Sequence, residues 1–134
     1  MESGSDRGLM QTYRPAGTVI FVSSGSPNAG VAQDIEAHGL VMHWARSIRA
    51  AVDLLKSARD KTVIVTDLAL ADGNWRDLVE QVRCIGMSTP VLLVTSSSTA
   101  ELWWDALECG IYDILPAQLM ASRLCQLLGT QIAS

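Results

Sequence analysis

A chain of 134 residues fits a single domain, and 49% hydrophobic residues can bury a core of ordinary size. Ten Lys and Arg against fourteen Asp and Glu leave a formal charge of −4, which argues against a surface that binds nucleic acid or an anionic membrane. No apolar stretch approaches the ~20 residues of a membrane span, and residues 1–8 hold no apolar signal core, so we expect a cytoplasmic protein.

The chain opens with a polar segment and a first strand–helix unit. Residues 1–16 are polar and punctuated by Gly and Pro, and we expect them to form a flexible N-terminal extension. The β-branched run at residues 18–22 predicts a strand. Ser26 followed by Pro27 suits the cap and first turn of a helix that runs to His38.

Two further units are predicted in the same way. A strand at residues 40–44 precedes a helix that Ser47 caps. A third strand covers residues 62–67, residues 68–73 are predicted as a loop, and a helix over residues 74–85 follows. The residues at helical spacing that are expected to face the core are Ile48, Ala51, Val52, Leu55, Leu78, Val79, Val82 and Ile85.

The remaining units complete an alternating pattern. A strand at residues 91–95 is followed by a helix that Thr99 caps and Gly110 ends. A strand at residues 112–115 is followed by a last helix over residues 118–128. Five strands alternating with five helices imply right-handed crossovers. We therefore predict a single α/β domain with a doubly wound, flavodoxin-like parallel sheet in the order 2-1-3-4-5.

Asp67 is the principal candidate for a functional site. It ends the third predicted strand, and open α/β sheets bind ligands at the carboxyl ends of their strands. The ends of the neighbouring strands offer the hydroxyls of Ser23, Ser24 and Thr95 and no acid. The chemistry that usually needs a cluster of carboxylates at this edge is therefore expected to be impaired.

Cysteine and histidine residues predict no metal centre. Cys84, Cys109 and Cys125 are odd in number and form no C-x-x-C pair, so we expect reduced thiols that pack as small hydrophobic side chains. His38 and His43 have no second ligand nearby in the sequence.

Four segments stand out by their order and spacing over residues 17–128. They are Val19–Val22 with Pro27, Val63–Leu68 with Asp72 and Gly73, Pro90–Thr95, and Ala106–Leu115. Through these segments together, the chain resembles the receiver domains of bacterial response regulators. We accordingly expect a receiver-like domain over residues 17–129, followed by a short tail at residues 130–134.

The resemblance implies phosphoryl transfer from a histidine kinase to Asp67. It also implies a Mg²⁺ ion held by an acidic pair, by the acceptor and by the backbone carbonyl of Ala69. The positions that match the other functional residues are Ser23 and Ser24 for the acidic pair, Ala117 for a lysine and Thr95 for the switch hydroxyl. Neutral hydroxyls cannot replace two negative charges around a divalent ion, so we expect no resident cofactor and at most weak Mg²⁺ binding.

Trp103 is the candidate for a protein interface. Adjacent helix positions diverge by about 100°, so Trp103 and Trp104 cannot both face the sheet, and we expect Trp103 to be exposed. Exposed tryptophans are enriched among interface anchors. The resemblance implies that the fourth helix, fifth strand and fifth helix form a surface that dimerises or meets an output partner.

The leading hypothesis is therefore a receiver-type signalling module of a two-component system and not an enzyme. It would act through contact with a histidine kinase or another signalling protein, with weak or absent phosphorylation of Asp67. Two alternatives stay open, a working phosphoacceptor on Asp67 and a flavodoxin-like cofactor binder, whose phosphate site would lie at the same strand ends. A mass gain at Asp67 and flavin absorbance would distinguish them.

Overall fold

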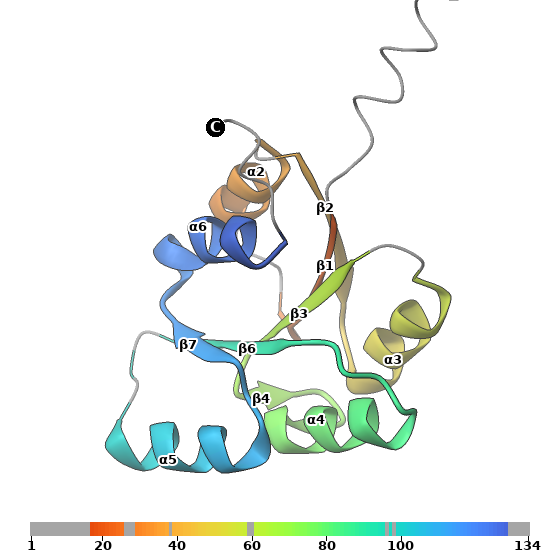
Figure 1. The fold of residues 1–134 in the computed structure, drawn as a ribbon, viewed down its shortest axis with the longest axis vertical. Coiled ribbons are helices and arrows are strands. Elements are labelled where there is room, and N and C mark those ends of the chain that lie inside the picture. Colours follow the sequence, from red (N-terminus) through yellow and green to blue (C-terminus); the bar gives the residue numbers. More distant parts are fainter. Residues whose placement is uncertain are drawn as a thin grey trace, which may run out of the picture.

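The computed structural model describes residues 17–25, 29–37, 39–58, 61–95, 97 and 99–128. Within them, the strands of the main sheet alternate with helices along the chain (Figure 1). The elements are β1 (Gly17–Val22), α2 (Ala29–Ala37), β2 (Leu40–Ala45), α3 (Ile48–Ser57), β3 (Thr62–Thr66), β4 (Ala69–Leu70), β5 (Gly73–Asn74), α4 (Trp75–Cys84), β6 (Val91–Val94), α5 (Ala100–Cys109), β7 (Asp113–Leu115) and α6 (Ala117–Leu128).

The main sheet has five parallel strands in the order β2-β1-β3-β6-β7. Counting only these strands along the chain gives the order 2-1-3-4-5, so the predicted α/β topology is confirmed. β1 and β3 lie inside the sheet and are almost wholly buried, as their continuous apolar runs predict.

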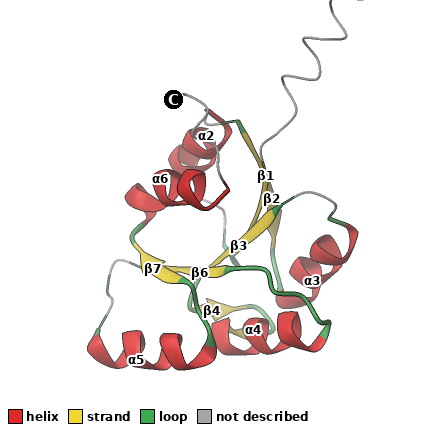
Figure 2. Cartoon of the chain, viewed as in Figure 1, coloured by secondary structure: helices red, strands yellow, loops and turns green. Residues whose placement is uncertain are grey.

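Helices cover both faces of this sheet (Figure 2). Ile20 and Val22 of β1 face a hydrophobic cluster that includes residues of α3, α4 and α5. Val19 and Phe21 of the same strand face a second cluster, with residues of α2 and α6. The alternation of side chains along a strand places one set on each face, which gives a three-layer domain.

The predicted helix ends are confirmed where the structure describes them. Ser47 accepts a hydrogen bond from the Ala50 amide at 3.1 Å, and Thr99 caps α5 in the same way. Gly110 ends α5 with a φ of 92°, a left-handed conformation that glycine adopts without strain. The predicted cap at Ser26 and Pro27, residues 1–16 and the tail at residues 130–134 lie outside the described residues.

The prediction of a plain loop at residues 68–73 is wrong. β4 and β5 pair as a short antiparallel hairpin, with Ala69 opposite Asn74 and Leu70 opposite Gly73. Two-residue strands are too short to show a periodic pattern, so the sequence carries no strand signal here. The hairpin leads directly into α4, because Asn74 and Asp77 bond each other's backbone in a reciprocal cap.

α5 is held to the domain by a few apolar side chains and by polar contacts from α4. Ala106 is its one buried residue, in a helix that is described throughout. Arg76 of α4 forms an ion pair with Asp105, and the Arg83 guanidinium donates to the Cys109 carbonyl at 2.8 Å. Most of the surface of α5 therefore faces away from the core.

The cysteines depart in part from expectation. Cys84 and Cys109 are free thiols, but Cys84 is exposed and Cys109 is half-buried, so the packing role expected for Cys84 is wrong. Its position follows from α4, which turns Val79 and Val82 toward the sheet and leaves Cys84 on the outer side. The Cys125 side chain lies outside the described residues. None of the helices that the structure describes is both long and apolar enough to cross a membrane.

Candidate functional site

Asp67 lies immediately after β3, at the carboxyl edge of the sheet. Its amide donates to the Val22 carbonyl at 3.1 Å, and its carbonyl accepts from the Thr66 hydroxyl at 2.9 Å. These two bonds fix the backbone of Asp67 against the end of β1, while its side chain is only half-buried. The backbone of Asp67 is therefore anchored, and its carboxylate is still reachable from solvent.

The two serines predicted to replace an acidic pair lie on the adjacent strand end. Ser23 is 5% exposed, and its hydroxyl accepts from the Gly25 amide at 3.3 Å. Its carbonyl accepts from the indole of Trp44 at 3.0 Å, which ties this loop to β2. Ser24 is exposed. One hydroxyl is therefore engaged in a local turn, and the other faces solvent.

Thr95 and Ala117 lie farther along the same edge. The Thr95 amide donates to the Leu115 carbonyl at 3.0 Å, and its hydroxyl accepts from the Ser97 amide at 3.1 Å. Ala117 begins α6 and supplies no charge at the position matched to a lysine. The strand order therefore brings Ser23, Asp67 and Thr95 to the carboxyl ends of the neighbouring strands β1, β3 and β6.

A basic side chain lies beside this edge. Arg46 follows β2, and its guanidinium carbon lies 4.5 Å from the centre of the Trp44 ring. Because the Trp44 indole is bonded to Ser23, this positive charge lies on the flank where the resemblance implies an acidic pair.

The donor groups at this edge do not fit a magnesium site of the implied kind. Mg²⁺ favours octahedral oxygen ligands, usually with carboxylates among them, and Asp67 is the one carboxylate among the matched positions. Within the described part of the chain, no three His, Cys, Asp or Glu side chains gather in a way that could hold a metal. The edge offers one acid, neutral hydroxyls and a backbone carbonyl.

Asp72 makes a contact that the sequence did not predict. Its carboxylate accepts hydrogen bonds from the Ile48 and Arg49 amides, at 2.8 and 3.2 Å. The bond from Ile48 is the main cause that lowers the pKa of Asp72 below its ordinary value of 3.8; partial burial opposes it, and the Arg49 amide adds to it. By itself, the dipeptide Asp72-Gly73 indicates only a turn. The one available signal was that the first turn of α3 contains no acid.

The two tryptophans of α5 are both exposed. Trp103 has 38% of its surface exposed, as predicted, but Trp104 has 69% exposed and is the more accessible of the two. Neither lies at the carboxyl edge of the sheet between β1 and β6. Leu107, one turn farther along α5, is also exposed. The exposed residues of α5 therefore include three large apolar side chains beside the charged Glu101 and Glu108.

Comparisons with known proteins agree with this architecture. The family model described as the response regulator receiver domain matches residues 11–129, so the match begins inside the expected extension. The response regulator protein PilR of Pseudomonas aeruginosa is 32% identical over 66% of this chain, and the DNA-binding transcriptional regulator NtrC of Rhizobium meliloti is 30% identical over 58%. The chain spans only 20% and 16% of the lengths of these relatives.

Solved structures show the same fold. The signal receiver domain of a putative Luxo repressor protein from Vibrio parahaemolyticus superposes with a TM-score of 0.74 at 18% identity, covering 90% of this chain and 95% of that one. A two-component response regulator from Clostridium difficile gives a TM-score of 0.72 at 16% identity, covering 88% of this chain and 99% of the other.

Proposed function

Because the chain belongs to the response regulator receiver domain family, we propose that it is an atypical receiver, a signalling module that acts mainly through protein contact. The observation that supports this is the single carboxylate at the carboxyl edge, with Ser23 and Ser24 at the acidic-pair positions and Ala117 at the lysine position. Phosphoryl transfer depends on positioned positive charge around the transferred oxygens. Because this edge would hold Mg²⁺ poorly, Asp67 would be phosphorylated slowly.

Phosphorylation of Asp67 is expected to be weak. With a small-molecule phosphodonor and Mg²⁺, labelling should be about a hundredfold or more slower than in a receiver that keeps both acids and the lysine, since losing one positioned electrostatic group commonly costs that much. Intact mass measured over time would follow the reaction. Any label that does appear should be absent from Asp67→Asn.

The second candidate is a working phosphoacceptor, which the retained Asp67 and Thr95 favour. Rapid, Mg²⁺-dependent labelling that Asp67→Asn abolishes would establish it and would contradict the atypical reading. The family match favours a receiver over the flavodoxin-like cofactor binder. Absorbance of the purified protein in the flavin region would test that third reading directly.

A homodimer or partner complex through α5, β7 and α6 is part of the proposal. These elements are the fourth helix, fifth strand and fifth helix of the domain. Trp103, Trp104 and Leu107 offer apolar contact area on α5. Between β7 and α6, Arg123 bonds Asp113 at 3.0 Å, so these two charges are already paired within one chain. The apolar residues of α5 would then supply most of the binding energy.

Loss of a tryptophan from α5 is expected to weaken this association. Trp103→Ala and Trp104→Ala should each raise the dimer dissociation constant about tenfold or more, the usual effect of removing an aromatic anchor. Sedimentation velocity over a concentration series would measure it. Met87→Ala removes a side chain of similar exposure from the loop after α4 and should leave association unchanged. A wild-type chain that is monomeric at high concentration, alone and with a cognate kinase, would contradict the interface.

The partner in this proposal is a histidine kinase or another signalling protein, in the cytoplasm. We propose the domain boundaries predicted above, with residues 1–16 as an extension and residues 130–134 as a tail. The acidic charge of −4 supports a protein partner rather than nucleic acid for this chain.

A further inference from the structure

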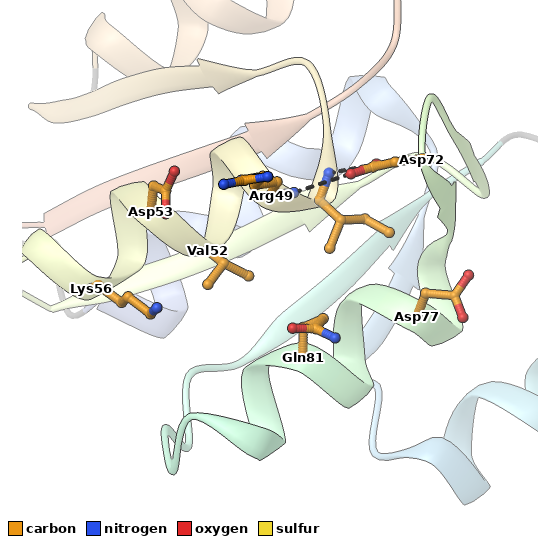
Figure 3. A pocket seen from close by; sticks show the side chains of 8 residues that line it. Arg49, Val52, Asp53, Lys56, Asp72, Asp77 and Gln81 are labelled. Atoms are coloured by element: carbon orange, nitrogen blue, oxygen red, sulfur yellow. Dashed lines mark hydrogen bonds between the residues drawn. The ribbon is translucent and has the colours of Figure 1, made fainter.

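The first turn of α3 takes two of its hydrogen-bond acceptors from a distant part of the chain. The first amides of a helix have no partner within the helix. In α3, Ser47 satisfies the Ala50 amide, and both oxygens of the Asp72 carboxylate satisfy Ile48 and Arg49 (Figure 3). Negative charge at a helix N-terminus is also favoured by the helix dipole. Asp72 therefore acts as a second cap, supplied by the hairpin.

The hairpin that carries Asp72 fits closely between α3 and α4. Leu70 is buried in the core. A Cβ atom added to Gly73 would lie 2.5 Å from an Asp77 oxygen and 3.0 Å from a methyl of Ile48. The hairpin backbone thus touches side chains of both helices, and Asp72 is its charge-assisted link to α3.

The same hairpin continues from Asp67. The segment of residues 67–74, here called the acceptor loop, starts at the bond from Asp67 to Val22 and ends at the cap of α4. Ala69, whose carbonyl the family resemblance implies as a metal ligand, lies in this loop opposite Asn74. The direction of that carbonyl therefore depends on how the hairpin is held.

We propose that Asp72 is a positioning residue that fastens the acceptor loop to α3, so that a change of the loop at Asp67 is passed to α3 and to the groove beside it. The inference rests on the proposed function, because it takes Asp67 as the acceptor position. The groove, of about 700 Å³, lies between α3 and α4 (Figure 3). Its charged lining residues are Arg49, Asp53 and Lys56 from α3, Asp72 from the hairpin and Asp77 from α4.

Hydrogen exchange in the full chain tests the link. In Asp72→Ala, the amides of Ile48 and Arg49 and those of residues 67–74 should all exchange about tenfold faster or more, because two charge-assisted bonds are lost. Asp72→Asn keeps one acceptor oxygen and should give a smaller change. Ser47→Ala is the matched control, since it weakens the same helix end without touching the hairpin. It should speed exchange in the first turn of α3 and leave residues 67–71 unchanged.

A pH titration monitored by amide chemical shifts distinguishes a positioning role of Asp72 from a general loosening of the domain. The ionised carboxylate accepts these bonds more strongly than the protonated acid, so they are at full strength above pH 3.8 and weaken as the pH falls through the lowered pKa of Asp72. The amides of Ile48, Arg49, Ala69 and Leu70 should share this midpoint in the wild-type chain. The step should vanish from all four in Asp72→Asn, which leaves the neighbouring carboxylates Asp53 and Asp77 in place.

Two outcomes would overturn the inference. One is an acceptor loop whose amide exchange rates and chemical shifts are unchanged in Asp72→Ala, while the first turn of α3 exchanges faster. The other is a Ser47→Ala variant that disturbs residues 67–71 as much as Asp72→Ala does. Phosphoryl labelling of Asp67, measured separately, bears on the proposed function alone. Efficient labelling would refute weak phosphorylation and would not affect the proposed link through Asp72. An acceptor loop that is unaffected in Asp72→Ala would refute the link, however fast Asp67 is labelled.

Discussion

The double substitution Ser23→Asp and Ser24→Asp should convert the carboxyl edge into a site that binds Mg²⁺. At about 4 Å in water, a divalent ion gains about 2 kcal/mol from each added carboxylate. The double variant should therefore bind Mg²⁺ at least about tenfold more tightly than the wild-type chain, even with substantial losses to screening by solvent. Isothermal titration with MgCl₂, or Mg²⁺-induced amide shifts near Asp67, would measure the gain.

Charge, rather than side-chain size, should produce this gain. Asparagines at both positions have nearly the same volume and no charge, and they should leave the affinity at the wild-type value. Adding Asp67→Asn to the double aspartate variant should remove most of the gain, because the acceptor completes the ligand set. A wild-type chain that already binds Mg²⁺ as tightly as the double aspartate variant would refute the account of a charge-poor edge.

The same substitution should make stability depend on magnesium. Ser23 is buried and its hydroxyl bonds the Gly25 amide, so an aspartate there places a charge where solvent is scarce. Without Mg²⁺ we expect a lower melting temperature than that of the wild-type chain. Saturating Mg²⁺ should restore part of the loss, because a ligand that binds only the folded state stabilises it.

Leu78→Ala should lower the free energy of unfolding by about 2–5 kcal/mol. Leu78 is 0% exposed and lies in the cluster between α4 and the sheet, so truncation leaves a cavity as well as removing buried apolar surface. Domains of this size are stable by about 5–15 kcal/mol in total, and the loss should lower the melting temperature by about 10 °C. Denaturation by urea, followed by far-UV circular dichroism, would give the value.

Leu107→Ala is the matched control for that experiment. It makes the same change in a helix of the same length, at a side chain that is 54% exposed. At a concentration where the chain is monomeric, its effect should stay within about 0.5 kcal/mol. Equal losses in the two variants would mean that burial against the sheet does not determine the stability of α4.

The difference between these two leucines bears on function. α4 is anchored by four buried side chains, whereas α5 has one, Ala106, together with the Arg76–Asp105 ion pair and the bond from Arg83 to the Cys109 carbonyl. Exposed ion pairs contribute little to stability. In the proposed complex, a partner that covers Trp103 and Trp104 would contact the helix with the smaller buried face.

Sequence alone determined the layered α/β fold of this chain. Continuous β-branched runs marked β1 and β3, and helical spacing marked the buried face of α3. The caps at Ser47 and Thr99 and the stop at Gly110 were also predicted, because such signals act between residues at most four positions apart. Asp67 was located in the same way, since a residue that follows a buried parallel strand must lie at the carboxyl edge.

Only the tertiary structure decided which long-range hydrogen bonds hold the loops at that edge. Asp72 meets α3 at residues 24 and 23 positions away, and Trp44 reaches the Ser23 carbonyl across 21 positions. No spacing rule connects such pairs, because they meet only after the strands have paired and the helices have packed. The exposure of both Trp103 and Trp104 has the same origin. How much of α5 is buried depends on the area of the sheet and of α4 that it contacts. The periodicity of one helix does not carry that information.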